Sequence, residues 1–295
     1  MDKPTGELVL LGESGMMGAA ILASQNAGRG LSNFVLPDTR SLLRRILDGD
    51  LKEVNDLCRR VTSPQVWIFS AGIIDPRLPE AELMRINVEA PTRLYAGLCR
   101  AAADAGAIHF VTFGSVLEER AQIVAVNSYI RSKARLLALW QEQAPAGRVP
   151  WTHYQLHTLY GGRRLQLSTF LGQIGAALQR NAPFHMSAGY QFREYHHTAD
   201  VASNVLRHIW TAAPKSSKIP MNSGCATRLR DVATTVFNHF GRPELLKIGS
   251  LAPQEGEVFE PSFRRSDHVI DFRDPVDGII AWLKELGIAS AAAKV

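Results

Sequence analysis

Ser115, Tyr129 and Lys133 are side chains whose types and order could carry out proton transfer. Tyr129 opens a segment that predicts a helix, and Lys133 lies four residues further on, so both side chains share one helix face. A nearby lysine ammonium favours the phenolate and lowers the pKa of a tyrosine. Such a tyrosine can donate a proton to a carbonyl that receives a hydride, or accept one from an alcohol that loses its hydride. The hydroxyl of Ser115, which follows a predicted strand at 108–113, could complete the set.

A glycine-rich segment near the start of the chain indicates what could supply a hydride. The apolar run 8–11 predicts a buried strand, and Gly12, Gly15 and Gly18 follow it before a predicted helix. This spacing allows a tight turn, a close approach of backbone to a pyrophosphate, and packing of helix on strand. The phosphates would bind to amides at the helix N-terminus, and the predicted cofactor site also takes in Ser14, Met16 and Met17. The alternative is a strand–helix turn with no ligand.

A Tyr-x-x-x-Lys pair is common by chance. Because Tyr129 and Lys133 follow this glycine fingerprint, a catalytic role is favoured over an unrelated surface tyrosine.

The residues after the second predicted strand, 33–36, bear on the choice of cofactor. An acidic residue at this place accepts hydrogen bonds from the ribose of NAD, whereas an arginine pairs with the 2′-phosphate of NADP. The chain offers both Asp38 and Arg40. Arg40 with Ser41 could hold a phosphate, so NADP(H) is favoured and NAD(H) is possible. The alternative is that Asp38 and Arg40 are ordinary loop residues.

Strands and helices alternate along the first half of the chain. This alternation predicts an α/β fold with a right-handed, doubly wound parallel sheet of the Rossmann type. Ligands of such a sheet bind at the carboxyl ends of the strands, where the small residues Ser70, Ala71 and Gly72 would let a cofactor lie against the backbone. His157 follows the predicted strand 151–156 and could contact nicotinamide or substrate. A half-buried histidine bonded to backbone is the equally favoured alternative.

Composition limits the class of protein. The chain has 295 residues, of which 46% are hydrophobic and 21% charged, which suits one large core or two unequal lobes. The net charge of +5 is scattered and does not alternate with aromatic residues, so no nucleic-acid surface is expected. The three cysteines and nine histidines lack the spacing of a disulfide framework or a metal site. No apolar stretch reaches the roughly 18 residues of a membrane span, and a cytoplasmic protein is expected.

The ordered motifs resemble the extended short-chain dehydrogenase/reductases, the NAD-dependent epimerase/dehydratase family. The matching segments, which span nearly the whole chain, are GESGMMG, NVEAPTRL, FVTFGSV, YIRSK, LHTLYGG, REYHHTADVA and NSGCATRLRDVA. The resemblance implies a Rossmann domain and a smaller C-terminal substrate-binding lobe that holds a nucleotide-sugar. The expected Rossmann domain is 1–160 together with 191–212, and the expected lobe is 161–190 with 213–295.

The resemblance also implies roles for individual residues. Tyr129 is the acid/base, Lys133 lowers its pKa and holds the nicotinamide ribose, and Ser115 orients the substrate carbonyl. Asn87 is mainly structural or lies near the cofactor. The substrate-binding residues that it implies, of which Arg193 and Arg264 (or Arg265) would meet the pyrophosphate, are Ser115, Glu118, Thr169, Arg193 and Arg264.

Departures from the family pattern narrow the expected reaction. Nucleotide-sugar dehydratases carry Thr-Asp-Glu just beyond the serine, where this chain has 116–119, VLEE, so 4,6-dehydration is not expected. Leu117 stands where GDP-fucose synthase has a cysteine for epimerisation. Gly114 replaces a frequent serine, and Gln155 and His157 stand where Arg and Pro are frequent.

These features predict a nucleotide-sugar 4-ketoreductase that uses Tyr129 as proton donor. A 4-epimerase with tightly bound NAD is the alternative, and a cofactor-binding sensor without turnover is a third hypothesis. Polysaccharide biosynthesis and antibiotic-sugar pathways are both open. The resemblance implies a homodimer formed through a four-helix bundle, for which the apolar positions of 90–102 and 134–140 are suitable.

Overall fold

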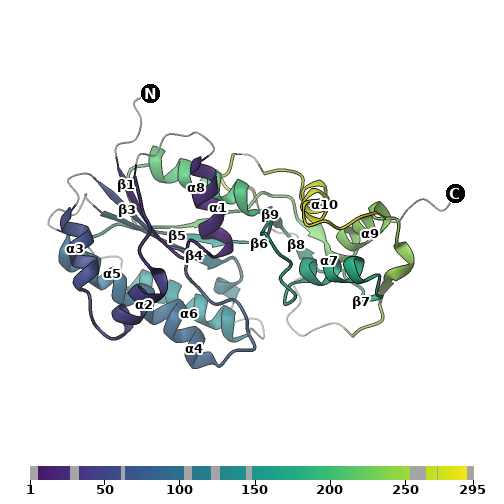
Figure 1. Cartoon of the computed structure of the whole chain (residues 1–295), viewed down its shortest axis with the longest axis horizontal. Helices are drawn as coiled ribbons and strands as arrows, with labels where there is room; N and C mark the ends of the chain where they lie inside the picture. Colours follow the sequence, from purple (N-terminus) through teal and green to yellow (C-terminus); the bar gives the residue numbers. More distant parts are fainter. Residues whose placement is uncertain are drawn as a thin grey trace. The chain divides into compact units, whose positions relative to one another are not determined.

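A parallel sheet, six-stranded among the described residues, forms the centre of the N-terminal part of the chain (Figure 1). This computed structural model describes residues 6–26, 33–60, 64–102, 108–120, 127–143, 148–252, 264–270 and 272–290. The chain divides into a first unit, Met1–Leu156 with Ala202–Pro220, and a second unit, His157–Val201 with Met221–Val295. Each unit has a hydrophobic core of its own.

The sheet of the first unit has the order β10-β5-β4-β3-β1-β2, and all its neighbouring strands are parallel. Its strands are β1 (Glu7–Leu11), β2 (Asn33–Val35), β3 (Gln65–Phe69), β4 (Ile108–Ser115), β5 (Trp151–Leu156) and β10 (Ser217–Pro220). Because β1 lies between β2 and β3, the strand order reverses there, which is where such sheets bind their ligands. The predicted doubly wound parallel sheet is confirmed.

Helices cover both faces of this sheet, and for that reason its central strands are buried along their length. Figure 1 shows α1 (Met16–Asn26) and α8 (Thr198–Thr211) on one face and α2, α5 and α6 on the other. The helices on that other face are α2 (Thr39–Leu47), α3 (Lys52–Arg60), α4 (Glu80–Met84), α5 (Ala90–Ala101) and α6 (Ser128–Gln143). Every residue of β3, β4 and β5 is buried, as expected for strands covered on both sides.

The chain forms a π-helical turn between two α-helices that follow β3. The turn spans Arg85–Glu89, between α4 and α5, and Pro91 follows in the first turn of α5. Proline has no N–H to donate to the preceding turn, and a wider turn accommodates that loss. Asn87 lies within this π turn, so its side chain takes a direction that a regular helix would not give it.

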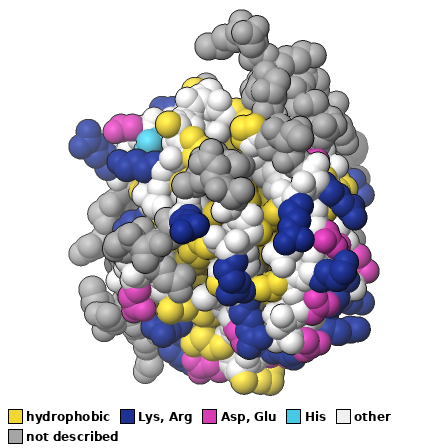
Figure 2. Space-filling model, turned by 90° about the vertical axis from the view of Figure 1, so that its left-hand side faces the viewer, with side chains coloured by type: hydrophobic (Ala, Val, Ile, Leu, Met, Phe, Trp, Pro, Cys, Tyr) yellow, Lys and Arg dark blue, Asp and Glu magenta, His cyan; other side chains and the backbone are white. Residues whose placement is uncertain are grey.

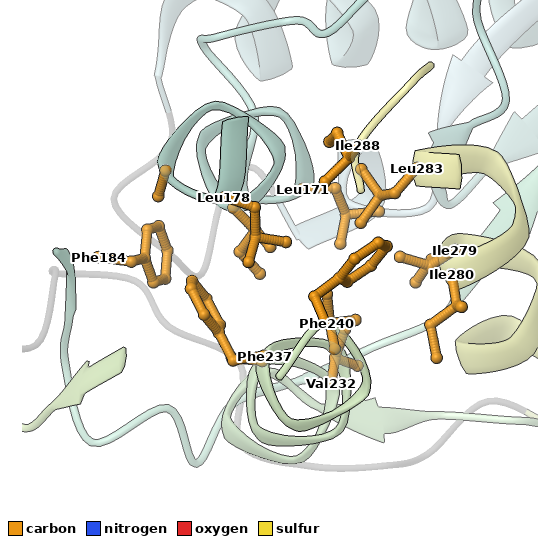
Figure 3. Close-up of a cluster of buried hydrophobic side chains, with 14 of the residues drawn as sticks. Leu171, Leu178, Phe184, Val232, Phe237, Phe240, Ile279, Ile280, Leu283 and Ile288 are labelled. Carbon is orange, nitrogen blue, oxygen red and sulfur yellow. The ribbon is translucent and has the colours of Figure 1, made fainter. Parts of the chain in front are cut away.

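In its described residues, the second unit is built mainly from short strand pairs and from three α-helices that pack on one another. The pairs are β6 (Thr158–Tyr160) with β9 (Tyr195–His197), β7 (Phe184–Met186) with β12 (Leu246–Ile248), and β8 (Phe192–Arg193) with β11 (Thr227–Arg228). The helices are α7 (Phe170–Arg180), α9 (Leu229–His239) and α10 (Pro275–Glu285). Figure 3 shows Leu178 of α7, Phe237 of α9 and Leu283 of α10 in one hydrophobic cluster.

The boundary between the units differs from the expected one at three places, since 157–160 and 191–201 belong to the second unit and 213–220 to the first. The resemblance assigns 213–220 to the C-terminal lobe, but β10 (Ser217–Pro220) pairs with β5 and extends the sheet of the first unit. Residues 191–201 were expected in the Rossmann domain, but they belong to the second unit, where β9 pairs with β6. Strand pairing between distant segments decides these assignments, and it is not a local property of the sequence.

The surface around α2 and α3 carries charges of both signs. Arg45 pairs with Glu53, and Lys52 pairs with Asp56 at 2.7 Å. Figure 2, which views the side of the molecule that lies to the left in Figure 1, shows basic side chains interspersed with acidic and hydrophobic ones. Within the described ranges, no helix has both the length and the hydrophobicity needed to cross a bilayer.

Candidate active site

Tyr129 and Lys133 lie on the first turns of α6, next to the carboxyl end of β4. Asn127 precedes the helix, and its Oδ1 accepts a hydrogen bond from the Ile130 N–H at 3.0 Å, which fixes where the helix begins. The Lys133 ammonium lies 5.8 Å from the centre of the Tyr129 ring and donates a hydrogen bond to the Phe113 carbonyl at 2.8 Å. The helix face predicted from the sequence therefore meets the strand that ends in Ser115.

Ser115 is the last residue of β4 and is 9% exposed. Its Oγ accepts a hydrogen bond from the Leu117 N–H at 3.2 Å, and its own N–H donates to a Glu118 carboxylate oxygen at 3.2 Å. Both contacts hold the backbone at the end of the strand, and the hydroxyl proton is left to donate elsewhere.

The ionisation of Tyr129 differs from the sequence-based expectation. Burial raises the pKa of Tyr129 above its ordinary value, and the Glu118 carboxylate adds to that rise. Burial also lowers the pKa of Lys133 to about 8, although Glu118 acts in the opposite direction. This direction is opposite to the lowering expected from the sequence, because burial removes the phenolate from water and so favours the neutral phenol. At neutral pH Tyr129 is a phenol that has a proton to donate.

Asn87 connects the loop after β3 to helix α6 by hydrogen bonds. Its Nδ2 donates to the Ile73 carbonyl at 2.9 Å and to the Ser132 hydroxyl at 3.0 Å, and its Oδ1 accepts from the Ile73 N–H at 2.9 Å. A Cβ placed on Gly72 would lie 3.3 Å from Asn87 Oδ1 and 3.9 Å from Lys133 Nζ. The small residues predicted to face a cofactor therefore pass directly beside the predicted catalytic lysine.

The glycine fingerprint forms a tight turn. Gly12 has φ +91°, and a side chain there would overlap the backbone of Ala71, while one on Gly18 would overlap the carbonyl of Gly12. The Ser70 hydroxyl donates to the Leu11 carbonyl at 2.7 Å and fastens the ends of β3 and β1 together. Two of the three glycine roles predicted from the sequence, the tight turn and the helix–strand contact, are present.

The residues at the start of α1 fit a dinucleotide diphosphate. A Cβ on Gly15 would meet only two backbone oxygens within 4 Å, those of Gly12 at 3.2 Å and Ser70 at 3.9 Å, so backbone there can be approached closely. The first turn of α1, which begins at Met16, carries no acidic side chain. Its amides have no intrahelical partner and attract anions.

Glu13 is a functional candidate that the sequence analysis missed. Thr39 Oγ1 accepts a hydrogen bond from the Gly12 N–H at 2.9 Å and donates to a Glu13 carboxylate oxygen at 2.7 Å. These contacts hold the carboxylate beside the segment that follows β2, where the adenosine ribose of a dinucleotide binds. Asp38 instead caps α2 by accepting from the Ser41 N–H at 3.2 Å, and Arg40 is exposed.

Glu118 does not face a substrate, contrary to the sequence-based expectation. Its side chain is fully buried and accepts hydrogen bonds from Gln155 Nε2 at 2.9 Å and His153 Nε2 at 3.1 Å, besides the bond from Ser115. Gly114 leaves the space that this cluster occupies, since a Cβ there would overlap both His153 and Glu118. Gly114 and Gln155, which both depart from the family pattern, therefore belong to one buried cluster with Glu118 and His153.

The remaining predicted residues belong to the second unit. Thr169 caps α7, because its Oγ1 accepts from the Gly172 N–H at 3.1 Å and donates to the Gln166 carbonyl at 2.8 Å. Arg264 is exposed, and Arg193 lies half-buried in β8. The substrate roles of Thr169, Arg193 and Arg264 stay predictions.

His157 is part of a buried cluster around Glu194, which the sequence analysis did not single out. The His157 side chain is 2% exposed, and its Nε2 lies 2.8 Å from Asn222 Oδ1. Burial lowers the pKa of His157 to about 4, so it is neutral at pH 7. Although burial favours the neutral acid, hydrogen bonds from His196 and Ser223, with His157 nearby, lower the pKa of Glu194 to about 2. This environment corresponds to the structural alternative for His157, with a side-chain partner in place of backbone.

Comparisons with known proteins show which solved structures share this fold. No protein-family model and no curated protein sequence matches this chain. The Bordetella bronchiseptica enzyme WbmG in complex with NAD is similar in structure, with 15% identity, a TM-score of 0.68, and 98% of this chain and 97% of that chain covered. RMD from Pseudomonas aeruginosa complexed with NADPH has 16% identity and a TM-score of 0.72, with 96% of this chain and 99% of that chain covered.

A GDP-L-fucose synthetase from Naegleria fowleri is also similar, with 14% identity, a TM-score of 0.68, and 99% of this chain and 97% of that chain covered. At these identities the similarity concerns the fold, and it extends over nearly the whole length of each chain. The chain thus has the two-part α/β fold, with a six-stranded parallel sheet in its described residues, that it shares with these NAD-, NADPH- and GDP-L-fucose-related proteins.

Proposed function

We propose that this protein is an NAD(P)-dependent oxidoreductase that reduces the 4-keto group of a nucleotide-linked 4-keto-6-deoxy sugar. The observation that carries the proposal is the neutral Tyr129 phenol beside the Lys133 ammonium, at the strand end that carries Ser115. A reductase needs its acid/base residue in the protonated form, because the carbonyl oxygen gains a proton as its carbon gains a hydride.

Three residues of the chain have separate roles in the proposed reaction. A bound nicotinamide would supply the hydride. The Ser115 hydroxyl orients the carbonyl oxygen, and the Tyr129 phenol gives that oxygen its proton. The Lys133 ammonium stabilises the negative charge left on the phenol oxygen until a solvent proton replaces the one transferred.

The substrate class is proposed from the solved structures of similar fold. WbmG has been solved with NAD and UDP, and MoeE5, at 18% identity and a TM-score of 0.64, with UDP-glucose and NAD. Arg193 and Arg264 are proposed to meet the substrate's pyrophosphate, since guanidinium groups bind phosphate in charge-assisted pairs.

The direct test offers UDP-, GDP- and dTDP-linked 4-keto-6-deoxy sugars to the protein with NADH or NADPH. The proposal expects oxidation of the reduced cofactor, followed as loss of absorbance at about 340 nm, in stoichiometric amount with one reduced sugar. Reduction of free 4-keto sugars at the same rate would contradict the nucleotide-linked substrate class.

A 4-epimerase with retained NAD is the second candidate, and Glu13 is the observation that favours it. A carboxylate beside the ribose site suits NAD, which an epimerase holds through its whole cycle. Denaturing the purified protein and identifying released cofactor by mass spectrometry separates the two. Near-stoichiometric NAD(H), with epimer formation and no net cofactor oxidation, would identify the epimerase.

Cofactor choice gives a prediction of its own. We expect the protein to bind NAD(H) more tightly than NADP(H), which departs from the preference inferred from Arg40. The reason is that Thr39 holds the Glu13 carboxylate beside the segment that follows β2, where it would accept a hydrogen bond from a ribose hydroxyl and would repel a 2′-phosphate. Glu13→Gln should bring the ratio of the two dissociation constants about tenfold toward NADP(H), measured by titration calorimetry on the cofactor-free protein.

Arg40→Ala is the matched control for that titration. Arg40 is exposed on the first turn of α2, where solvent screens its charge, so we expect a change below about threefold. A loss of NADP(H) binding in this variant, with no effect of Glu13→Gln, would restore Arg40 as the deciding residue.

A further inference from the structure

The end of β4 rests on a buried carboxylate that the proposed chemistry does not use. Glu118 and His153 both have fully buried side chains, and their closest atoms, Oε1 and Nε2, are 3.1 Å apart. His153 Nδ1 lies 2.7 Å from Thr112 Oγ1 on the other side of the ring. An Nε2–H tautomer therefore satisfies both contacts, since Thr112 can donate to Nδ1 while Nε2 donates to Glu118.

Burial of a carboxylate is costly, so a group that is kept there needs several donors. Glu118 has three: the His153 ring, the Gln155 amide at 2.9 Å and the Ser115 backbone N–H at 3.2 Å. Removing one partner from such a set leaves an uncompensated buried group, and this strongly penalises any movement of the donors. The Ser115 backbone is therefore fastened to β5 through Glu118.

Lys133 also binds the backbone of the same short segment. Its ammonium donates to the Phe113 carbonyl at 2.8 Å, two residues before the serine. Gly114 lies between the two anchors, and only a residue without a side chain leaves room there for His153 and Glu118. The three residues 113–115 are thus held at one end by Lys133 and at the other by the buried Glu118 side chain.

We propose that Glu118, held by His153 and Gln155, is a positioning residue that places Ser115 for catalysis and acts as the counter-charge of Lys133, which binds the same strand end. The proposal rests on the proposed function for its catalytic part. The Glu118 proposal extends the proposed function, because it gives a supporting role to a buried carboxylate for which the sequence suggested a substrate contact.

The charges around the site are few. Among the described residues, the titratable groups that act on Tyr129 and Lys133 are Glu118 and, for each, the other member of the pair. Arg131, further along α6, is exposed and paired with Glu80. Removing the Glu118 charge should lower the pKa of both Lys133 and Tyr129, since a negative neighbour favours the ammonium and disfavours the phenolate.

The test compares Glu118→Gln with Glu119→Gln in the cofactor-free full-length protein. Glu119 is the next residue, but it is exposed and pairs with Lys218 at the surface, so it controls for loss of one carboxylate in the same turn. The pKa of Lys133 is measured by competitive acetylation over a pH series, with peptide mapping by mass spectrometry. This readout needs no substrate, so it stands even if the proposed reaction is wrong.

In the wild type we expect Lys133 to titrate near pH 8. Glu118→Gln should move that titration about one unit lower, a tenfold change in the ratio of ammonium to amine at a given pH, and Glu119→Gln should leave it in place. Once a substrate is in hand, the basic limb of kcat should move to lower pH in Glu118→Gln alone, with cofactor affinity unchanged. A folded Glu118→Gln protein with the wild-type Lys133 titration would overturn the proposal.

Glu118→Asp keeps the carboxylate but shortens the side chain by one methylene group. It provides a second test if the Glu118→Gln protein does not fold. We expect its Lys133 to titrate near the wild-type pH while kcat falls about tenfold, because the Ser115 N–H loses its acceptor. Wild-type kcat in this variant would overturn the positioning role, and a Lys133 titration shifted as far down as in a charge-free variant would overturn the electrostatic role.

Discussion

Replacing Tyr129 by phenylalanine should lower turnover about 10³-fold while leaving cofactor affinity within about threefold of the wild type. The substitution removes one hydroxyl from a half-buried ring and leaves the helix and the Lys133 contact to Phe113 in place. The loss should fall on kcat, because the proton is transferred only in the chemical step. Steady-state kinetics with the accepted sugar nucleotide, and calorimetry for the cofactor, provide the two measurements.

Tyr190→Phe is the matched control, since Tyr190 is 52% exposed in the second unit and its hydroxyl removal costs no buried contact. Its kcat should equal that of the wild type. If Tyr129→Phe also turns over at the wild-type rate, the proton comes from another group and the assignment of Tyr129 is wrong.

Replacing Gly12 by alanine should both destabilise the protein and abolish dinucleotide binding. At φ +91° an L side chain is strained, and here the added Cβ would overlap the backbone of Ala71. That backbone cannot move away freely, because the Ser70 N–H donates to the Leu11 carbonyl at 2.9 Å and joins β3 to β1. We expect a loss of about 3 kcal/mol in the free energy of unfolding, measured by urea denaturation.

Gly49→Ala separates the two causes of that loss. Gly49 has a similar backbone conformation, φ +86°, but nothing lies within 4 Å of its added Cβ. It should lose only about 1 kcal/mol, from the backbone strain, and should bind cofactor as the wild type does. Equal losses in the two variants would show that overlap at Gly12 is relieved, and that the turn is less constrained than the structure indicates.

Much of the first unit could be predicted because its signals are local. The apolar run before Gly12 became β1, and the alternation of buried strands with helices gave the parallel sheet. The four-residue spacing of Tyr129 and Lys133 was enough to place both on one face of α6. Such patterns depend on helix and strand periodicity, which the chain carries without reference to distant residues.

The assignment of segments to units was less predictable. β10 joins the sheet of the first unit by pairing with β5, more than sixty residues earlier in the chain. Short strands such as β6, β8 and β9 have no clear periodicity, and their partners are set by the packing of the second unit.

The sequence by itself determined the parallel sheet, the glycine turn and the pairing of Tyr129 with Lys133, because each follows from backbone geometry over a few residues. Only the tertiary structure decided the surroundings of Glu118 and Glu13 and the direction in which the pKa of Tyr129 moves. Glu118 is a surface-type residue in the sequence, yet three donors from two strands hold it fully buried. Glu13 is held in place by Thr39, which follows α1 and β2 in the sequence. The pKa of Tyr129 rises where the sequence suggested a fall, because desolvation depends on everything packed around a group, and a spacing rule cannot include it.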